Sequence, residues 1–167
     1  LYFAKRAIQQ QDYAILVEGY LDVISMHQAG IENVVASSGT SLTTDQIRLL
    51  GRFTKNITVI YDGDPAGIHA SLRGIDMILK EGMNVRVVLL PEPEDPDSFA
   101  RSHTAAEVQE YIRDNERDFL EFKANLLLHD AQGDPIRKAA LIGDMVQSIA
   151  QIPDPIQRSV YIKECAR

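Results

Sequence analysis

The amino-acid sequence predicts an α/β protein whose mostly parallel, four-stranded sheet is flanked by helices and followed by an all-helical subdomain. Short apolar runs alternate with helical patterns over about the first 100 residues, which is typical of α/β folds. Polar residues rarely interrupt these runs, as in strands that are buried on both faces. After about residue 98 the strand signals end, and apolar residues recur three or four positions apart, as they do along helices.

Glycines and threonines at the ends of the apolar runs set the limits of the predicted elements. Gly30, Gly51 and Gly82 follow helical patterns, and Thr43 or Thr44 caps the helix that ends near Gly51. The first half is therefore predicted to contain helices at residues 1–10, 21–28, 44–50 and 65–80, and strands at residues 13–17, 33–36, 57–61 and 85–90.

The second half begins after an acidic, proline-rich loop at residues 91–97. Asp134-Pro135 and Asp154-Pro155 are helix starts, because Asp caps a helix and Pro is favoured at its first position. We expect helices at residues 105–113, 117–129, 136–150 and 156–166. One apolar stripe is predicted on the third of these, from Ala139, Ile142, Val146 and Ile149. The spacing of Tyr111, Phe119 and Phe122 favours core positions over platforms for stacking bases.

The 167 residues predict two units, one at residues 1–101 and a helical one at residues 102–167. The chain starts at Leu1 and stops within a helical pattern, so we expect a fragment of a longer protein. A single cysteine, Cys165, excludes an internal disulfide and fits a reducing cytoplasm. No apolar stretch is long enough to span a bilayer. The formal net charge of −7 argues against a free-standing nucleic-acid binder, which usually has a basic face.

Acidic residues follow two of the predicted strands at the points where these strands end. Glu18 comes directly after residues 14–17, and Asp62 and Asp64 follow residues 57–61. Because ligands bind beyond the carboxyl ends of strands in open α/β sheets, we expect these carboxylates in one crevice. There they would repel one another unless a hard cation such as Mg²⁺ bound their oxygens. This pattern favours phosphoryl or nucleotidyl transfer, or phosphodiester cleavage.

Each of these acidic elements also has a purely structural interpretation. Asp64 precedes Pro65 and is equally suited to capping a helix. Asp22, four residues after Glu18, is favourable in the first turn of a helix because of the helix dipole. After the fourth strand, Asp95 and Asp97 are candidates for a second metal, although Asp97 is also suited to capping a short helix at residues 98–100.

Another candidate site follows the second strand. The amides and hydroxyls of Gly39, Thr40 and Ser41 are able to hold a phosphate, and the alternative is an ordinary turn with helix caps.

Four motifs closely resemble the TOPRIM domain, in particular that of bacterial DnaG-type DNA primases. The resemblance runs from about residue 1 to residue 101 and rests on residues 17–23, 36–41, 61–67 and 90–97. It implies that Glu18, Asp62 and Asp64 bind the catalytic metals, Mg²⁺ or Mn²⁺. The accessory acids of the family fall on Asp22, Asp95 and Asp97. Two departures are Ser38, where many primases have Leu, and Pro93, where the acidic loop often has Gly.

The same resemblance implies a function. A primase synthesises short RNA primers on a single-stranded DNA template from ribonucleoside triphosphates, by metal-dependent nucleotidyl transfer. We expect the zinc-binding domain, which holds Zn²⁺, the basic amino-terminal subdomain and the carboxyl-terminal domain that meets the replicative helicase to lie outside this chain. We also expect the isolated chain to be inactive. The alternatives are a TOPRIM nuclease with water as the nucleophile and a non-enzymatic TOPRIM binding module.

Overall fold

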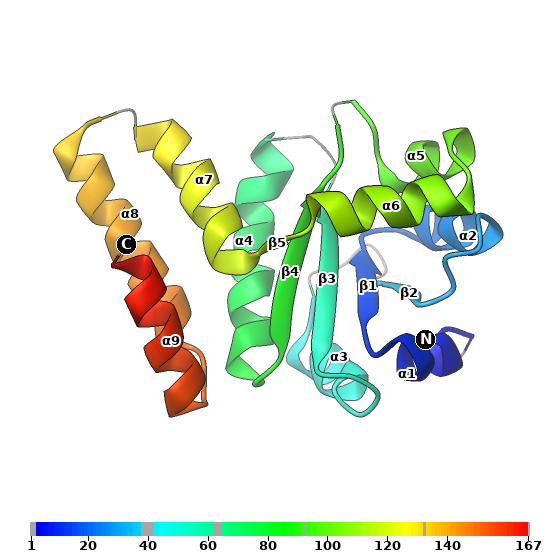
Figure 1. Ribbon diagram of the computed structural model, residues 1–167, viewed down its shortest axis with the longest axis horizontal. Coiled ribbons are helices and arrows are strands. Elements are labelled where there is room, and N and C mark those ends of the chain that lie inside the picture. Colours follow the sequence, from blue (N-terminus) through cyan, green and yellow to red (C-terminus); the bar gives the residue numbers. More distant parts are fainter. Residues whose placement is uncertain (1–2, 38–41, 62–64, 92, 132, 167) are drawn as a thin grey trace.

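A five-stranded sheet forms the centre of the molecule (Figure 1). The computed structural model describes residues 3–37, 42–61, 65–91, 93–131 and 133–166, and for residues 65–71, 73 and 127–131 it describes the backbone alone. The strand order is β2-β1-β3-β4-β5. The strands are β1 (Ala14–Val17), β2 (Val34–Ala36), β3 (Asn56–Tyr61), β4 (Asn84–Leu89) and β5 (Arg117–Asp118).

The first four strands are parallel, as the sequence predicts, and their register aligns their carboxyl ends. Leu16 pairs with Val59 between β1 and β3, and Tyr61 pairs with Leu89 between β3 and β4. The fold class is therefore confirmed, with one addition. The two-residue strand β5 pairs antiparallel with β4, although this segment was expected to begin a helix. A strand this short has no periodicity that sequence reasoning can detect.

Helices connect the strands and form the carboxyl-terminal region. They are α1 (Lys5–Gln11), α2 (Tyr20–Gln28), α3 (Thr44–Leu50), α4 (Pro65–Lys80), α5 (Pro96–Ser102), α6 (Ala105–Asn115), α7 (Phe119–Ala131), α8 (Pro135–Ala150) and α9 (Pro155–Cys165). Among the described residues, none of these helices is long and apolar enough to cross a membrane.

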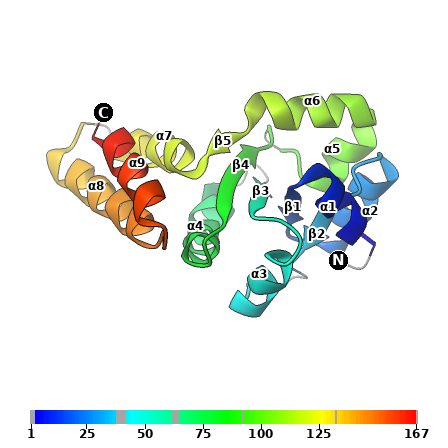
Figure 2. The ribbon, with the colours of Figure 1, turned by 60° about the horizontal axis from the view of Figure 1, so that its bottom comes forward.

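The sheet separates two hydrophobic clusters, because successive side chains of a strand point to opposite faces. On β3, Val59 packs in the cluster with α3, α4, α7 and α8, whereas Ile60 packs in the cluster with α2, α5 and α6. Figure 2 shows the resulting layers, with α5 and α6 on one side of the sheet and α3 and α4 on the other. The near-continuous apolar runs in the sequence therefore reflect burial on both faces.

Local capping signals explain several helix starts. Thr43 caps α3 and accepts a hydrogen bond from the backbone of Gln46. Asp134 and Asp154 cap α8 and α9, and Pro follows each of them at the first helical position, as predicted. The helix after β4 is longer than expected, because α5 begins at Pro96 and its cap is Asp95, not Asp97.

The predicted apolar stripe on α8 is wrong at three of its four positions, and one of these, Ala139, is exposed. Ile142 and Val146 are 52% and 51% exposed, whereas Leu141, Met145 and Ile149 are buried. The buried face is rotated by about one residue, because α8 packs between α7 and α9. The core positions predicted for Phe119 and Phe122 are confirmed, and Tyr111 is partly buried.

Candidate functional site

The carboxyl ends of β1, β3 and β4 lie at one edge of the sheet. Glu18 directly follows Val17, the last residue of β1, and its side chain is exposed. Tyr61 and Leu89, which end β3 and β4, are register partners, and the backbone N–H of Leu90 donates to the carbonyl of Tyr61 at 3.0 Å. The chain therefore leaves three neighbouring parallel strands at the same edge, which is where open α/β sheets bind ligands.

Helix α2 begins two residues after Glu18. Gly19 is the N-cap of α2, with an extended backbone. Its N–H donates to Oδ2 of Asp22 at 3.2 Å. Because the first amides of a helix lack intrahelical partners, a carboxylate in the first turn stabilises this start. Asp22 thus has the structural role that the sequence offered as one of its two interpretations.

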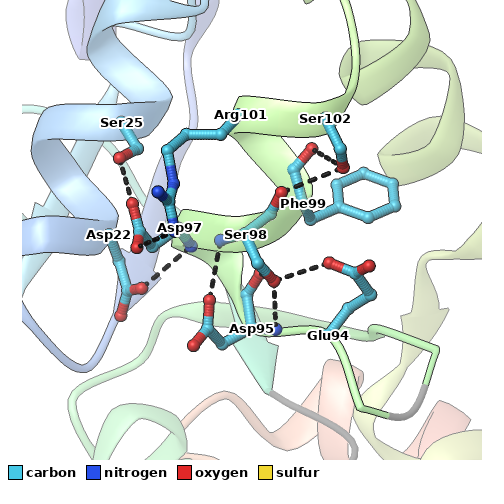
Figure 3. A network of polar contacts seen from close by, with 9 residues as sticks. All are labelled: Asp22, Ser25, Glu94, Asp95, Asp97, Ser98, Phe99, Arg101 and Ser102. Atoms are coloured by element: carbon cyan, nitrogen blue, oxygen red, sulfur yellow. Dashed lines mark hydrogen bonds and ion pairs between the residues drawn. The ribbon is translucent and has the colours of Figure 1, made fainter.

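The same carboxylate also reaches the helix that follows β4. Oδ1 of Asp22 accepts a 3.0 Å hydrogen bond from the backbone N–H of Asp97 (Figure 3). The hydroxyl of Ser25 donates to Oδ1 of Asp97, and Arg101 forms an ion pair with Oδ2 of Asp97 at 3.1 Å. We call Asp22, Ser25, Asp97 and Arg101 the α2–α5 clasp. It fixes the helix after Glu18 against the helix after β4.

The start of α5 is held by a second set of polar contacts. Oδ1 of Asp95 accepts a 2.7 Å hydrogen bond from the N–H of Ser98, and the N–H of Asp95 donates to Oγ of Ser98 at 3.1 Å. The hydroxyl of Ser98 also donates to Oε2 of Glu94 at 2.5 Å. These bonds form a capping box, so the acidic loop has a defined conformation at residues 94–98.

Burial and repulsion act on Asp22. Burial raises the pKa of this carboxyl, hydrogen bonds from the amides of Asp97 and Gly19 oppose the rise, and the charges of Asp95 and Asp97 add to it. The three carboxylates are therefore close enough to interact electrostatically. The neighbouring charges of Asp95 and Asp97 therefore disfavour ionisation of Asp22.

The structure brings together part of the predicted site. Asp22, Asp95 and Asp97 form one cluster. Glu18 lies at the edge of the sheet, directly before the N-cap of α2. Asp62 and Asp64 lie outside the described residues, as do Gly39, Thr40 and Ser41. Among the described residues, no three His, Cys, Asp or Glu side chains form a complete metal site.

Sequence reasoning missed the residues that organise this cluster. The spacing of Arg101 from Asp97 is the usual one for a helical ion pair and gave a usable signal. Ser25 lies 72 residues from Asp97 in the sequence, so only the fold brings them together.

An all-oxygen donor set suits a hard cation such as Mg²⁺ or Mn²⁺. In the α2–α5 clasp, however, both oxygens of Asp22 and both of Asp97 already accept hydrogen bonds or an ion pair. Asp22 and Asp97 are therefore suited to positioning, and the carboxylate of Glu18 is exposed at the edge of the sheet.

Two known families match parts of the chain. The family described as Toprim-like matches residues 15–100, which include most of β1, all of β2 to β4 and most of α5. The family described as the DnaB-helicase binding domain of primase matches residues 121–167, in α7 to α9. This second match differs from the expectation that helicase binding depends on a domain outside the chain.

Curated relatives are DNA primases. That of Clostridium acetobutylicum is 36% identical over 156 residues, which are 92% of this chain and 26% of the relative. That of Aquifex aeolicus is 45% identical over 112 residues, or 67% of this chain and 22% of the relative. The chain thus spans about a quarter of the length of the curated relatives that it matches.

Solved structures share the whole architecture. A DNA primase domain from Pseudomonas aeruginosa is 30% identical with a TM-score of 0.87, over 99% of this chain and 53% of that chain. A DnaG primase catalytic domain bound to single-stranded DNA is 31% identical with a TM-score of 0.85, over 99% of this chain and 55% of that chain.

Proposed function

The chain belongs to the Toprim-like family as it occurs in bacterial DnaG-type DNA primases, and we propose that it holds the catalytic metal ions of such a primase. The complete enzyme would synthesise short RNA primers on single-stranded DNA from ribonucleoside triphosphates. The observation that carries this proposal is the Toprim-like match at residues 15–100, within which Glu18 directly follows β1 at the carboxyl edge of the sheet.

In this proposal Glu18, Asp62 and Asp64 hold Mg²⁺ or Mn²⁺. The bound cation would supply charge stabilisation for the triphosphate and for the attacking 3′-hydroxyl of the primer. Asp22 and Asp97 act as positioning residues, because the α2–α5 clasp holds the helix after Glu18 in place. Asp95 caps α5 and adds negative charge to the cluster.

Further parts of the chain have proposed roles in the same reaction. Gly39, Thr40 and Ser41 are candidates for a phosphate contact, as their amide and hydroxyl chemistry allows. Residues 1–101 would form the metal-binding domain and residues 102–167 a helical subdomain. Zn²⁺ would bind only in a separate domain, and the protein would act in the cytoplasm.

The partners of the complete enzyme are proposals as well. They would be the single-stranded template, ribonucleoside triphosphates, the RNA primer and the replicative helicase. The match of α7 to α9 to a family described as helicase-binding supports a helicase contact in this region as well.

Primer synthesis by the whole primase that carries this chain tests the proposal. Glu18→Gln and Asp62→Asn should each lower incorporation of labelled ribonucleotides on single-stranded DNA by about 100-fold or more, an effect typical of removing a group that stabilises transition-state charge. Asp144→Asn is the control, because Asp144 is an exposed carboxylate on α8. Full activity of both the Glu18→Gln and the Asp62→Asn variant would contradict the proposal.

The nuclease alternative has a distinct outcome. A Toprim nuclease needs water and metal but no nucleotides. Supercoiled plasmid incubated with the protein and Mn²⁺, without ribonucleotides, should stay intact if the protein is a primase. Nicking that Asp62→Asn abolishes would favour the nuclease.

A further inference from the structure

A groove with acidic walls lies between the loop after β4 and helix α6. Its hollow measures about 580 Å³, which is within the range of about 300–1,000 Å³ that ligand pockets occupy. We call it the acidic groove. Its described lining residues fall into an apolar and aromatic group, a carboxylate group and one amide: Pro91, Pro93, Phe99, His103 and Tyr111; Glu94, Glu107, Glu110 and Asp114; and Asn115.

The apolar wall of the acidic groove is held rigidly. The ring of His103 stacks on Phe99 with centroids 4.2 Å apart, and Tyr111 packs against Phe99 at 4.9 Å. The hydroxyl of Tyr111 donates a 2.7 Å hydrogen bond to the carbonyl of Leu89. Pro91 restricts the backbone where the chain leaves β4. A preformed wall lowers the entropy that a bound partner has to lose.

Negative charge predominates in the acidic groove. Four carboxylates line it, and its described lining residues include no Lys or Arg. The backbone N–H of Thr104 lowers the pKa of Glu107 and keeps it ionised. Glu110 and Asp114 lie one turn apart on α6, both are exposed, and among the described residues neither side-chain carboxylate has a hydrogen bond or ion pair. Their negative charge is therefore available to a partner.

We propose that the acidic groove binds a basic polypeptide segment. The long aliphatic stem of an Arg or Lys packs well on prolines and aromatic rings while its charged head stays near carboxylates. The partly exposed ring of Tyr111 adds a favourable surface for a cation. Nucleic acid is the wrong occupant, because its phosphates would meet four carboxylates.

A polypeptide also suits the groove better than a small cation does. A hard metal ion prefers oxygen ligands and gains nothing from prolines and aromatic rings. An Arg-containing segment uses both the apolar wall and the carboxylates.

Binding of the basic peptide Trp-Gly-Arg-Gly-Arg-Gly-Arg to the 167-residue chain tests the proposal. The chain contains no tryptophan, so fluorescence of the peptide Trp reports binding without interference. Glu110→Gln with Asp114→Asn should weaken the affinity about threefold to tenfold, as expected for the loss of two exposed ion pairs. Glu32→Gln with Asp144→Asn removes the same charge from exposed sites outside the groove and should change the affinity less than about twofold.

Three results would overturn the proposal. The first is equal weakening by the two double variants, which would indicate general attraction to an acidic protein. The second is equally tight binding of a peptide whose Arg residues are all replaced by Gln. The third is displacement of the peptide by spermine or Mg²⁺ when either supplies positive charge at about the same concentration as the peptide does. Circular dichroism of both double variants should match the wild type, since the replaced side chains are exposed.

Discussion

The hydroxyl of Ser148 on α8 donates a 2.7 Å hydrogen bond to Oδ1 of Asp76 on α4, which joins the carboxyl-terminal helices to the layer that covers the sheet. The same hydroxyl oxygen accepts a 2.6 Å bond from Nζ of Lys123 on α7. Ser148 is fully buried and Lys123 is 8% exposed. One hydroxyl therefore connects a buried cation to a carboxylate across three helices.

Replacing Ser148 by Ala should destabilise the chain by about 1–3 kcal/mol, because the buried ammonium of Lys123 and the half-buried carboxylate of Asp76 each lose a hydrogen-bond partner. Of its hydrogen bonds within the described part of the chain, Nζ of Lys123 would keep the one to the carbonyl of Asp144, at 3.3 Å. Urea unfolding measures the change, with Ser159→Ala as the control. Ser159 is exposed on α9, so its variant should stay within about 0.5 kcal/mol of wild type. Equal midpoints for the two variants would show that the buried hydroxyl contributes nothing.

Asp22 should tolerate neither Ala nor Asn. Both of its oxygens accept backbone N–H groups, from Gly19 and from Asp97, so an Asn side chain would set its own NH₂ group against one of these donors. We expect both variants to lose about 1–2 kcal/mol of unfolding free energy. Asp154→Asn is the matched control and should change little, since the side chain of Asp154 caps α9 by accepting from the N–H of Ile156, and Asn caps a helix equally well. A harmless Asp22→Asn would argue against the α2–α5 clasp.

Stability should depend on pH through Asp118. Burial raises the pKa of this carboxyl, although hydrogen bonds from Tyr161 and from the N–H of Leu120 partly oppose the rise. A raised pKa means that the folded chain binds the proton more tightly than the unfolded chain does. The stability that the folded chain gains from this proton is thus complete below the usual carboxyl pKa of 3.8, and it is lost as pH rises through the folded-state pKa of Asp118.

The unfolding free energy of wild type, relative to Asp118→Asn, should therefore increase as the pH is lowered through this window. Urea unfolding of both proteins over a pH series measures the difference. Tyr161→Phe removes a hydrogen bond that lowers the pKa of Asp118, so it should move the window to higher pH. A difference that does not vary with pH would refute the assignment.

Mn²⁺ or Mg²⁺ should raise the melting temperature of the chain. At 100 times the dissociation constant, one site that exists only in the folded state contributes about 2.7 kcal/mol. For a chain of this length, that corresponds to a shift of about 5–10 °C. Asp62→Asn with Asp64→Asn should largely abolish the shift, whereas Asp144→Asn should retain it. If Asp62 and Asp64 only capped a helix, Asn would cap equally well and the shift in melting temperature caused by the metal would be unchanged.

Local signals in the sequence were sufficient for much of the fold. The parallel strands were predictable because their apolar runs are buried on both faces. The starts of α8 and α9 were predictable because Asp134 and Asp154 bind the first amides of their own helices. The order of the acidic motifs likewise identified the family before any contact was known.

The sequence by itself therefore determined the first four strands and most of the helices, because each depends on neighbours within a few residues, and the order of its motifs determined the family. Only the tertiary structure decided that Ser25 and Arg101 hold Asp97, and that β5 adds a strand. It also decided which face of α8 is buried and which carboxylates line the acidic groove. Contacts between residues far apart in the chain depend on how whole helices pack, and no local pattern encodes that packing.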